Sequence, residues 1–300
     1  MTSRQPLHGV LVVDKPSGPT SFEVVQRVAH ALGVKKAGHT GTLDPLATGV
    51  LPVCLGEATK LATHLVGHDK RYRATVRLGI ETDTLDAAGR VVAQRAVPSF
   101  DDAEVEAALA PCRGKFLQRP PAYSAVHVDG ERAHARARRG EAPLPAEREV
   151  DVRVLEVALR TPTEIVLDVE CAKGTYVRSI AAAIGERLGC GAHLAALRRE
   201  RVGPFTIERA IPLATIEERP QEARAAVLAP ALALGAIPAV VLTSEGVRRV
   251  RQGQAVGADG WVRADAAPEG AVVRCLDEAG ALVAVGARRG GAVRALRVLV

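Results

Sequence analysis

One carboxylate stands in a loop that otherwise consists of small residues and one histidine. Asp44 follows two glycines and two threonines in the stretch "GHTGTLDPLATGV". These residues allow three interpretations. The loop is a turn whose Thr and Asp side chains bond to backbone amides, which is the commonest role of an Asp before Pro. Alternatively, "GHTG" clamps an RNA backbone as a GxxG loop does. In the third, Asp44 is a nucleophile, which requires an ionised carboxylate held by a nearby cation.

Signatures of cofactor chemistry are missing from the sequence. It contains no GxxxxGK[ST] motif, so a P-loop is excluded. The five cysteines are scattered singly and form no CxxC pair. We therefore expect no metal centre and no cofactor, and we interpret the cysteines as small core residues.

Composition and charge bound the class of protein. The chain has 300 residues, of which 47% are hydrophobic and 25% charged, as is typical of a soluble globular protein. It has no run of apolar residues long enough for a membrane span, and its N-terminus lacks an apolar signal core. We expect a cytoplasmic protein. The net charge of +6 and the pI near 9.3 favour an anionic partner such as nucleic acid.

The elements that position Asp44 can be predicted from periodicity. An apolar strand at 10–13 precedes a helix that begins with a capping box at Thr20 and Glu23 and ends at Gly33. A buried strand at 50–56 follows the loop. In "KRYRATVRLG", alternation predicts a strand with Tyr72 on its apolar face and arginines on the other.

Further along, residues 148–160 and 163–174 are predicted to be strands and "TYVRSIAAAIGERLG" a helix. We expect "AHLAALRRERVGPF" to be a second short helix that runs into a strand. The fold class is α+β, with a mixed, largely antiparallel sheet and flanking helices. An Ala-, Pro- and Glu-rich stretch then predicts a boundary between a domain at 1–237 and a small β-rich domain at 238–300.

The motifs around these elements resemble those of one enzyme family, the pseudouridine synthases of the TruB type. The resemblance rests on five segments in one order: "DKPSGPTSFEVV", "GHTGTLDPLATGVLPVCLGEATK", "KRYRATVRLGIETDTLDAAG", "QRPPAYSAVHVDGERA" and "KGTYVRSIAAAIGERLGCGAHLAALRRERVGPF". It covers roughly residues 8 to 210. It implies an isomerase that converts uridine to pseudouridine at position 55 in the TΨC loop of tRNA, by base flipping and without a cofactor.

The resemblance implies three catalytic residues. Asp44 would attack the substrate covalently, at C6 of the base or at C1′ of the sugar, two possibilities that the sequence leaves open. Arg178 would hold the Asp44 carboxylate, because a guanidinium stays protonated and orients its partner. Tyr72 would stack on the uracil and is a candidate for the final deprotonation at C5.

The resemblance also implies residues that bind the substrate. His39 would stack into the RNA loop when the base leaves it, Tyr176 is a second aromatic residue close to Arg178, and Leu197 would line the base pocket. Lys15 and Lys60 match basic positions for which support of the site, contact with phosphate and an ordinary solvated surface lysine all remain open.

An insertion at about 118–148 is expected to clamp the RNA arm, using a basic run that includes Arg132 and Arg136. This sequence has His134 where the family more often has tyrosine, which leaves the role of His134 open. The segment after Pro238 resembles a PUA-type RNA-binding domain in which Arg248, Arg249 and Arg251 would contact phosphates.

The partners follow from the same resemblance. We expect tRNA, bound at its T-arm and elbow, no membrane, no obligate protein partner and a monomer. The alternative is a non-catalytic RNA-binding or tRNA-folding protein on the same scaffold. A guide-dependent homologue of the archaeal kind is disfavoured by the intact "QRPPAYSAVHVDGERA" segment.

Overall fold

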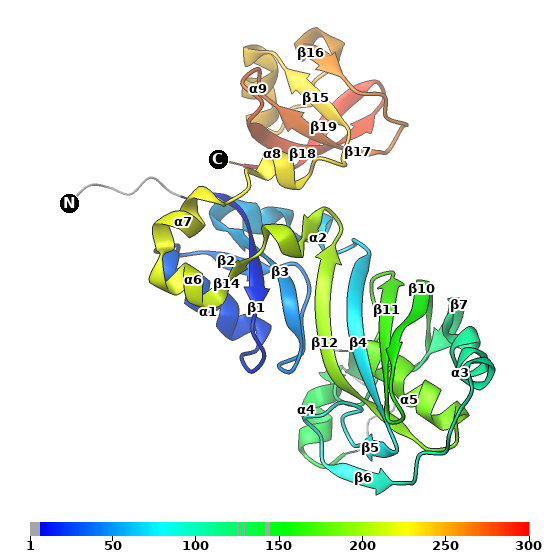
Figure 1. Cartoon of the computed structure of the whole chain (residues 1–300). Coiled ribbons are helices and arrows are strands. Elements are labelled where there is room, and N and C mark those ends of the chain that lie inside the picture. The colour runs from blue at the N-terminus through cyan, green and yellow to red at the C-terminus, as the bar shows by residue number, and fades with distance from the viewer. Residues whose placement is uncertain (1–6, 125, 129, 142–144, 300) are drawn as a thin grey trace.

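The computed structural model describes residues 7–124, 126–128, 130–141 and 145–299. The side chains of Arg132, His134 and Arg138 also lie outside the description. A ten-stranded sheet forms a large unit and a five-stranded sheet forms a small one. Figure 1 shows the small unit at one end of the molecule, beyond the strands β1 (Gly9–Lys15) and β3 (Thr48–Leu55).

The large sheet is mixed and mainly antiparallel, as the sequence predicts. Its strand order is β14-β1-β3-β12-β4-β11-β10-β7, with β2 added beside β3 and β13 beside β12. Two pairs are parallel, β1 with β14 and β12 with β3. The other strands are β2 (Ala37–His39), β4 (Lys70–Leu78), β7 (Gly114–Gln118), β10 (Arg148–Arg160), β11 (Glu164–Cys171), β12 (Ala192–Val202), β13 (Phe205–Thr206) and β14 (Ile211–Pro212).

One predicted element is wrong. The segment that begins at Ala192 is one continuous strand, β12, and not a short helix followed by a strand. Its Ala, Leu and Arg residues have high helix propensity. However, β12 lies between β3 and β4, and its pairing with β4 extends from Ala192 to Val202 with two register shifts. Hydrogen bonds to neighbouring strands override a weak local preference.

Helices cover one face of the large sheet. Helix α1 (Ser21–Leu32) has the predicted capping box at Thr20 and ends at Gly33 in the left-handed conformation. With it, α5 (Val177–Arg187) and α3 (Asp102–Leu109) bury the main core, to which Tyr72 and Leu155 belong. The other helices before the small unit are η1 (Gly56–Leu61), α2 (Ala62–Leu65), η2 (Ala110–Cys112), α4 (Ala133–Arg138), η3 (Ile207–Arg209), α6 (Leu213–Glu218), α7 (Pro220–Ala225) and α8 (Pro230–Ala233).

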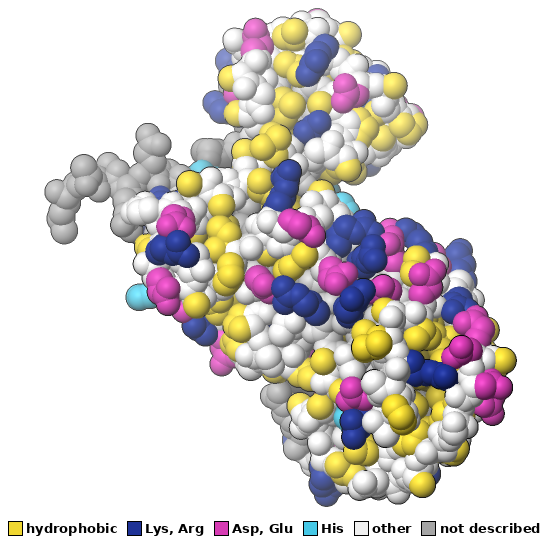
Figure 2. Space-filling model, viewed as in Figure 1, with side chains coloured by type: hydrophobic (Ala, Val, Ile, Leu, Met, Phe, Trp, Pro, Cys, Tyr) yellow, Lys and Arg dark blue, Asp and Glu magenta, His cyan; other side chains and the backbone are white. Residues whose placement is uncertain are grey.

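The opposite face of the sheet is covered over only part of its width. Val10, Val12 and Val50 pack there in a second core that includes Val285 and Leu299 of the small unit. Over β4, β11 and β10, by contrast, this face is open to solvent. Figure 2 shows acidic and basic side chains interspersed over these strands.

Two hairpins project from the large unit, and the five-stranded sheet forms the small one. The hairpins are β5 (Ile80–Thr82) with β6 (Val91–Gln94), and β8 (His127–Val128) with β9 (Glu131–Arg132). The small sheet has the order β16-β15-β17-β18-β19. Its elements are β15 (Ala239–Leu242), α9 (Ser244–Arg251), η4 (Ala258–Gly260), β16 (Trp261–Ala264), β17 (Val272–Leu276), β18 (Leu282–Arg289) and β19 (Ala292–Val298). Among the helices formed by described residues, none is long and apolar enough to cross a membrane.

Candidate active site

Asp44 and Arg178 meet at the covered face of the large sheet. Arg178 follows the first residue of α5, yet its side chain is only 5% exposed, so it is not the surface arginine that a helix position alone would suggest. Its Nε lies 2.9 Å from Oδ2 of Asp44, whose side chain is 35% exposed. The pair therefore combines a buried cation with a carboxylate that solvent can reach.

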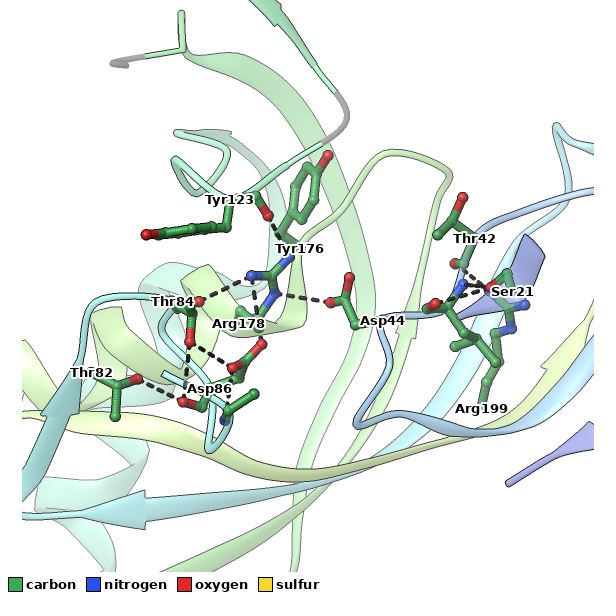
Figure 3. A network of polar contacts seen from close by, with 12 residues as sticks. Ser21, Thr42, Asp44, Thr82, Thr84, Asp86, Tyr123, Tyr176, Arg178 and Arg199 are labelled. Atoms are coloured by element: carbon green, nitrogen blue, oxygen red, sulfur yellow. Dashed lines mark hydrogen bonds and ion pairs between the residues drawn. The ribbon is translucent and has the colours of Figure 1, made fainter. Parts of the chain in front are cut away.

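The remaining nitrogens of Arg178 are held by backbone and by a second acid. Nη1 donates to the carbonyl oxygen of Thr84 at 3.0 Å, and Nη2 donates to that of Tyr123 at 2.9 Å. Oδ2 of the buried Asp86 lies 3.6 Å from Nη1. Asp86 is itself fixed, because its Oδ1 accepts hydrogen bonds from the Thr84 hydroxyl and from the backbone N–H of Ala88. Figure 3 shows these groups around a guanidinium that points toward Asp44.

Lys15 lies beneath the Asp44 loop. Its side chain is fully buried, and its Nζ donates to the carbonyl oxygens of Pro16, Pro45 and Ala47 at 2.7–3.0 Å. Lys15 is therefore not a solvated surface lysine. Support of the site fits its burial, since a phosphate could not reach the ammonium group without displacing the loop. Burial lowers the pKa of Lys15 to about 8, although the nearby Asp44 carboxylate opposes that shift.

A second buried cation holds the other side of the loop. Arg199 of β12 is 1% exposed, and it donates to the carbonyl oxygens of Val50, Thr42 and Gly41 at 2.7, 3.1 and 3.0 Å. Its backbone also passes so close to Gly49, which has a φ of +98°, that a Cβ there would lie 2.2 Å from the carbonyl oxygen of Arg199. A larger residue at position 49 would therefore push the loop and β12 apart.

Tyr72 is the cross-strand partner of Arg199 in the pairing of β4 with β12. Its ring is 7% exposed and belongs to the main core, on the face that alternation predicts. Burial raises the pKa of Tyr72 to about 12, and the Arg199 guanidinium partly offsets this. The phenol is therefore protonated at neutral pH, with a cation beside it that would favour its phenolate form.

The pKa of Asp44 results from opposing influences. Burial raises it above its ordinary value, Arg178 lowers it, Asp86 raises it and Lys15 lowers it. The cation opposes the protonation that burial favours and holds the carboxylate in one orientation, which is what an aspartate nucleophile requires. The surroundings of Asp44 thus meet the physical requirement for covalent chemistry.

Three other predicted residues lie on elements that border this site. His39 is half-buried at the end of β2, where it pairs with Val53, and burial lowers its pKa. Tyr176 is the N-cap residue of α5, two positions before Arg178. Leu197 of β12 packs against the main core and is the partner of Ala74 in β4.

Two other predicted binding residues, Lys60 and Arg136, are held by neighbours outside the Asp44–Arg178 pair. Lys60 Nζ donates to the carbonyl oxygen of Val298 at 3.2 Å and pairs with Glu57, at the contact between the two units. Arg136 lies on α4 and pairs with Glu141. The side chain of Arg132 lies outside the described residues, as does that of His134.

Sequence reasoning missed Arg199 and Asp86. Arg199 follows Arg198, whose guanidinium pairs with Asp14 and is 42% exposed, and nothing local tells the two arginines apart. Asp86 lies in "TDTLDAAG", where its neighbours Thr84 and Ala88 suggest an ordinary turn. Alternation along a strand is the signal that indicates an inward Arg199, and a helical interpretation of this segment hides it.

The described residues contain no group of three or more His, Cys, Asp and Glu side chains that could hold a metal ion. The functional groups gathered here are instead one carboxylate that solvent can reach, one buried carboxylate, three buried cations and a phenol. Such a set can supply a nucleophile, a counter-ion and a proton acceptor.

Comparison with known proteins matches the chain to one family along nearly its whole length. The profile described as "TruB family pseudouridylate synthase (N terminal domain)" matches residues 29–177. That of the "tRNA pseudouridylate synthase B C-terminal domain" matches 178–233, and "Pseudouridine synthase II TruB, C-terminal" matches 238–299.

Curated relatives and solved structures agree with this match. A protein of Burkholderia pseudomallei named tRNA pseudouridine synthase B is 43% identical over 299 residues, which is 99% of each chain. That of Xanthomonas euvesicatoria is 45% identical over 253 residues, 83% of this chain and 82% of the relative.

Two solved structures cover 97% of the chain with TM-scores of 0.75, at 27% and 29% identity. The first is an H/ACA RNP bound to a substrate RNA containing 2′-deoxyuridine, and the match covers 85% of its chain. The second is a Cbf5-Nop10-Gar1 complex, and the match covers 84% of its chain. The profiles and the relatives match the segments that contain Asp44 and Arg178 as well as most of the remaining sequence. The chain therefore belongs to the TruB family of pseudouridylate synthases.

Proposed function

We propose that this protein isomerises uridine to pseudouridine at position 55 in the TΨC loop of tRNA, with Asp44 as the nucleophile. The observation that carries the proposal is the 2.9 Å contact between the reachable carboxylate of Asp44 and the buried Nε of Arg178. The names of the curated relatives, tRNA pseudouridine synthase B, support tRNA as the substrate.

The reaction exchanges one glycosidic bond for another within the same nucleotide. The C1′–N1 bond breaks, the uracil turns, C1′ bonds to C5, the hydrogen on C5 leaves as a proton, and N1 takes up a proton in its place. Asp44 forms a transient covalent bond to C6 or to C1′ and is released at the end, so atoms and electrons balance without an external reagent. Arg178 keeps the carboxylate ionised and aimed during the attack.

Tyr72 and Arg199 provide a route for the proton on C5. The Tyr72 ring forms a flat apolar surface against which a uracil can stack, with Leu197 on the adjacent strand. The base would be the Tyr72 phenolate, formed when the phenol has given up its own proton and favoured by the Arg199 guanidinium beside it. This phenolate would accept the proton from C5 and become a phenol again.

The uridine must leave the RNA stack to reach Asp44. His39 would fill the space in the RNA loop, and the insertion at 118–148, with Arg132 and Arg136, would hold the T-arm. The catalytic domain would end near residue 237, and the small unit, with α9, would contact the RNA beyond the elbow. We infer that the protein acts in the cytoplasm as a monomer, without a protein partner.

The test follows tritium release from T-arm RNA that carries tritium at C5 of the target uridine. We expect release by the wild type and none by Asp44→Asn, which keeps the volume of the side chain but removes the nucleophile. The matched control is Asp168→Asn, because Asp168 is also paired with an arginine, Arg73, but lies on the open face of the sheet.

Binding of the same RNA separates catalysis from recognition. Asp44→Asn should bind it within a few fold of the wild type. If neither protein releases tritium and both bind the RNA, then the alternative stands: a non-catalytic RNA-binding protein in which Asp44 belongs to a clamp or a turn. Equal release by wild type and Asp44→Asn would show that Asp44 is not the nucleophile.

A further inference from the structure

The insertion leaves and re-enters the large sheet at a single pair of residues. Strand β7 ends at Gln118 and β10 begins at Arg148, and these two residues are cross-strand partners in the β7–β10 pairing. The whole excursion from 119 to 147 is therefore anchored at one point of the sheet. The side chains of this anchor pair both contact the same residue, Tyr176.

Gln118 holds the backbone of Tyr176. Its Oε1 accepts a hydrogen bond from the Tyr176 N–H at 2.8 Å, and its Nε2 donates to the Tyr176 carbonyl at 3.1 Å. The side chain is only 5% exposed, so these two hydrogen bonds form with little competition from water. They fix the position and the orientation of the Tyr176 backbone relative to the end of β7.

Arg148 holds the ring of the same residue. Its guanidinium carbon lies 5.0 Å from the centre of the Tyr176 ring, which is a cation–π geometry. It also donates to the carbonyl oxygen of Gly174, two residues earlier. Gln118 thus holds the backbone of Tyr176, and Arg148 contacts its ring.

Tyr176 controls the start of the helix that carries Arg178. It is the N-cap residue of α5, but it offers no side-chain cap to the helix, so the entry of the chain depends on contacts from outside. Two further contacts join the insertion to this first turn. The Ser179 hydroxyl donates to the Arg119 carbonyl, and Arg178 Nη2 donates to the Tyr123 carbonyl, both at 2.9 Å.

We propose that Gln118 and Arg148 are positioning residues that couple the RNA-holding insertion to the catalytic pair. Through Tyr176 they set the first turn of α5, and with it the placement of Arg178 against Asp44. This inference rests on the proposed function, because it assigns the anchor a role in isomerisation. It predicts that loosening the anchor slows the chemical step more than it weakens RNA binding.

The variants are Gln118→Leu, which removes both hydrogen bonds to Tyr176, and Arg148→Lys, which keeps the charge but loses the planar group over the ring. Arg153→Lys on the same strand is the matched control for Arg148→Lys, because Arg153 pairs with Asp69 and Asp151 on the open face. Val152→Ala is the control for lost stability, because Val152 is a buried residue of β10 that contributes to the same core.

We expect each anchor variant to lower the single-turnover rate at saturating RNA on the order of tenfold, since small misplacements of reacting groups have effects of this size. The dissociation constant of the RNA should change less than about threefold, a range well within 1 kcal/mol. The rate reductions of the two substitutions should not multiply, because both act through Tyr176. The double variant should therefore be only slightly slower than the slower single variant. Both control variants should keep the wild-type rate.

The pH dependence supplies a readout that a purely structural role would not move. Arg178 lowers the pKa of Asp44, so loosening Arg178 should shift the acidic limb of the pH–rate profile to higher pH. Asp86, Lys15 and Arg199, the other charged groups that interact with Asp44, are unchanged in these variants. Any of three results would overturn the proposal. The acidic limb of the pH–rate profile could lie at the same pH as in the wild type, the rate reductions could multiply in the double variant, or Val152→Ala could slow the reaction as much as the anchor variants do.

Failure of the proposed function would look different. In that case the wild type itself would release no tritium, whereas failure of the coupling leaves an active wild type and anchor variants that are equally active or lose RNA binding alone. If Gln118→Leu does not fold, Arg148→Lys with its control on the same strand still decides the question.

Discussion

Arginine is used in two different ways on the two faces of the large sheet. On the open face of β4, Arg73 lies 2.9 Å from Asp168 and Arg77 lies 3.0 Å from Glu164, with arginine side chains 40–50% exposed. On the covered face, Arg199 is 1% exposed and its described hydrogen bonds go to three backbone carbonyls. Lys15 is fully buried and also donates to three carbonyls.

The arginine charges on the open face are neutralised by carboxylates, whereas, among the residues that the structure describes, the charges of Arg199 and Lys15 on the covered face are not. A carboxylate cancels the charge of its arginine, so the open face has little net field to attract RNA. A carbonyl satisfies the donors of a cation but does not cancel its charge. Positive potential therefore persists under the loop that carries Asp44, where it stabilises an ionised carboxylate and favours an anionic substrate.

Removing a buried cation should have the largest effect. Arg199→Met leaves three carbonyl oxygens without their donor, and each buried unsatisfied group costs about 1–3 kcal/mol. We expect the free energy of unfolding to fall by about 3 kcal/mol and isomerisation to be lost, because the 41–50 loop is no longer tied to β12. Urea denaturation with Arg73→Met as the matched control measures the first effect. Similar losses in both variants would contradict the comparison.

The protonation of Lys15 should make its contribution depend on pH. Its pKa is lowered to about 8 in the folded protein from an ordinary value of 10.5, so the folded state binds fewer protons than the unfolded state between these values. Stability that involves Lys15 should therefore rise as the pH increases from 8 toward 10. The free energy of unfolding of the wild type minus that of Lys15→Met should increase by on the order of 2 kcal/mol over this range. A constant difference in urea titrations at pH 7 and pH 10 would show that Lys15 titrates normally.

The smallest effect should come from the open face. Arg73→Ala breaks an exposed ion pair with Asp168, and such pairs are worth about 0.2–1 kcal/mol. We expect the free energy of unfolding to change by less than about 1 kcal/mol, with an unchanged rate of tritium release and an unchanged salt dependence of RNA binding. A weaker salt dependence would instead place the open face in the RNA interface.

Local sequence predicted some of the elements around the site correctly. The helix α1 could be predicted from Thr20, Glu23 and Gly33, because a capping box and a left-handed glycine are local devices that act within a few residues. The inward orientation of Tyr72 could be predicted from alternation along β4, since a strand has a period of two whatever its neighbours are.

Other features depended on partners that are distant in the chain. The segment that begins at Ala192 has the composition of a helix, but it forms β12 because β4 and β3 pair with it on either side. The same error concealed Arg199. Likewise, the two lysines of "DKPSG" and "GEATK" look alike in sequence, yet Lys15 is buried under the Asp44 loop and Lys60 lies at the contact with the small unit.

The sequence by itself therefore determined the α+β class, the family resemblance, and Asp44 and Arg178 as the predicted nucleophile and its counter-ion. The class follows from local periodicity, whereas the roles of Asp44 and Arg178 are implied by the family resemblance of the segments that contain them. Only the tertiary structure decided which cations are buried, how Asp86 holds Arg178, and that Gln118 and Arg148 meet at Tyr176. These depend on burial and on contacts between residues as far apart as 158 positions, and neither burial nor such contacts are encoded in any single segment.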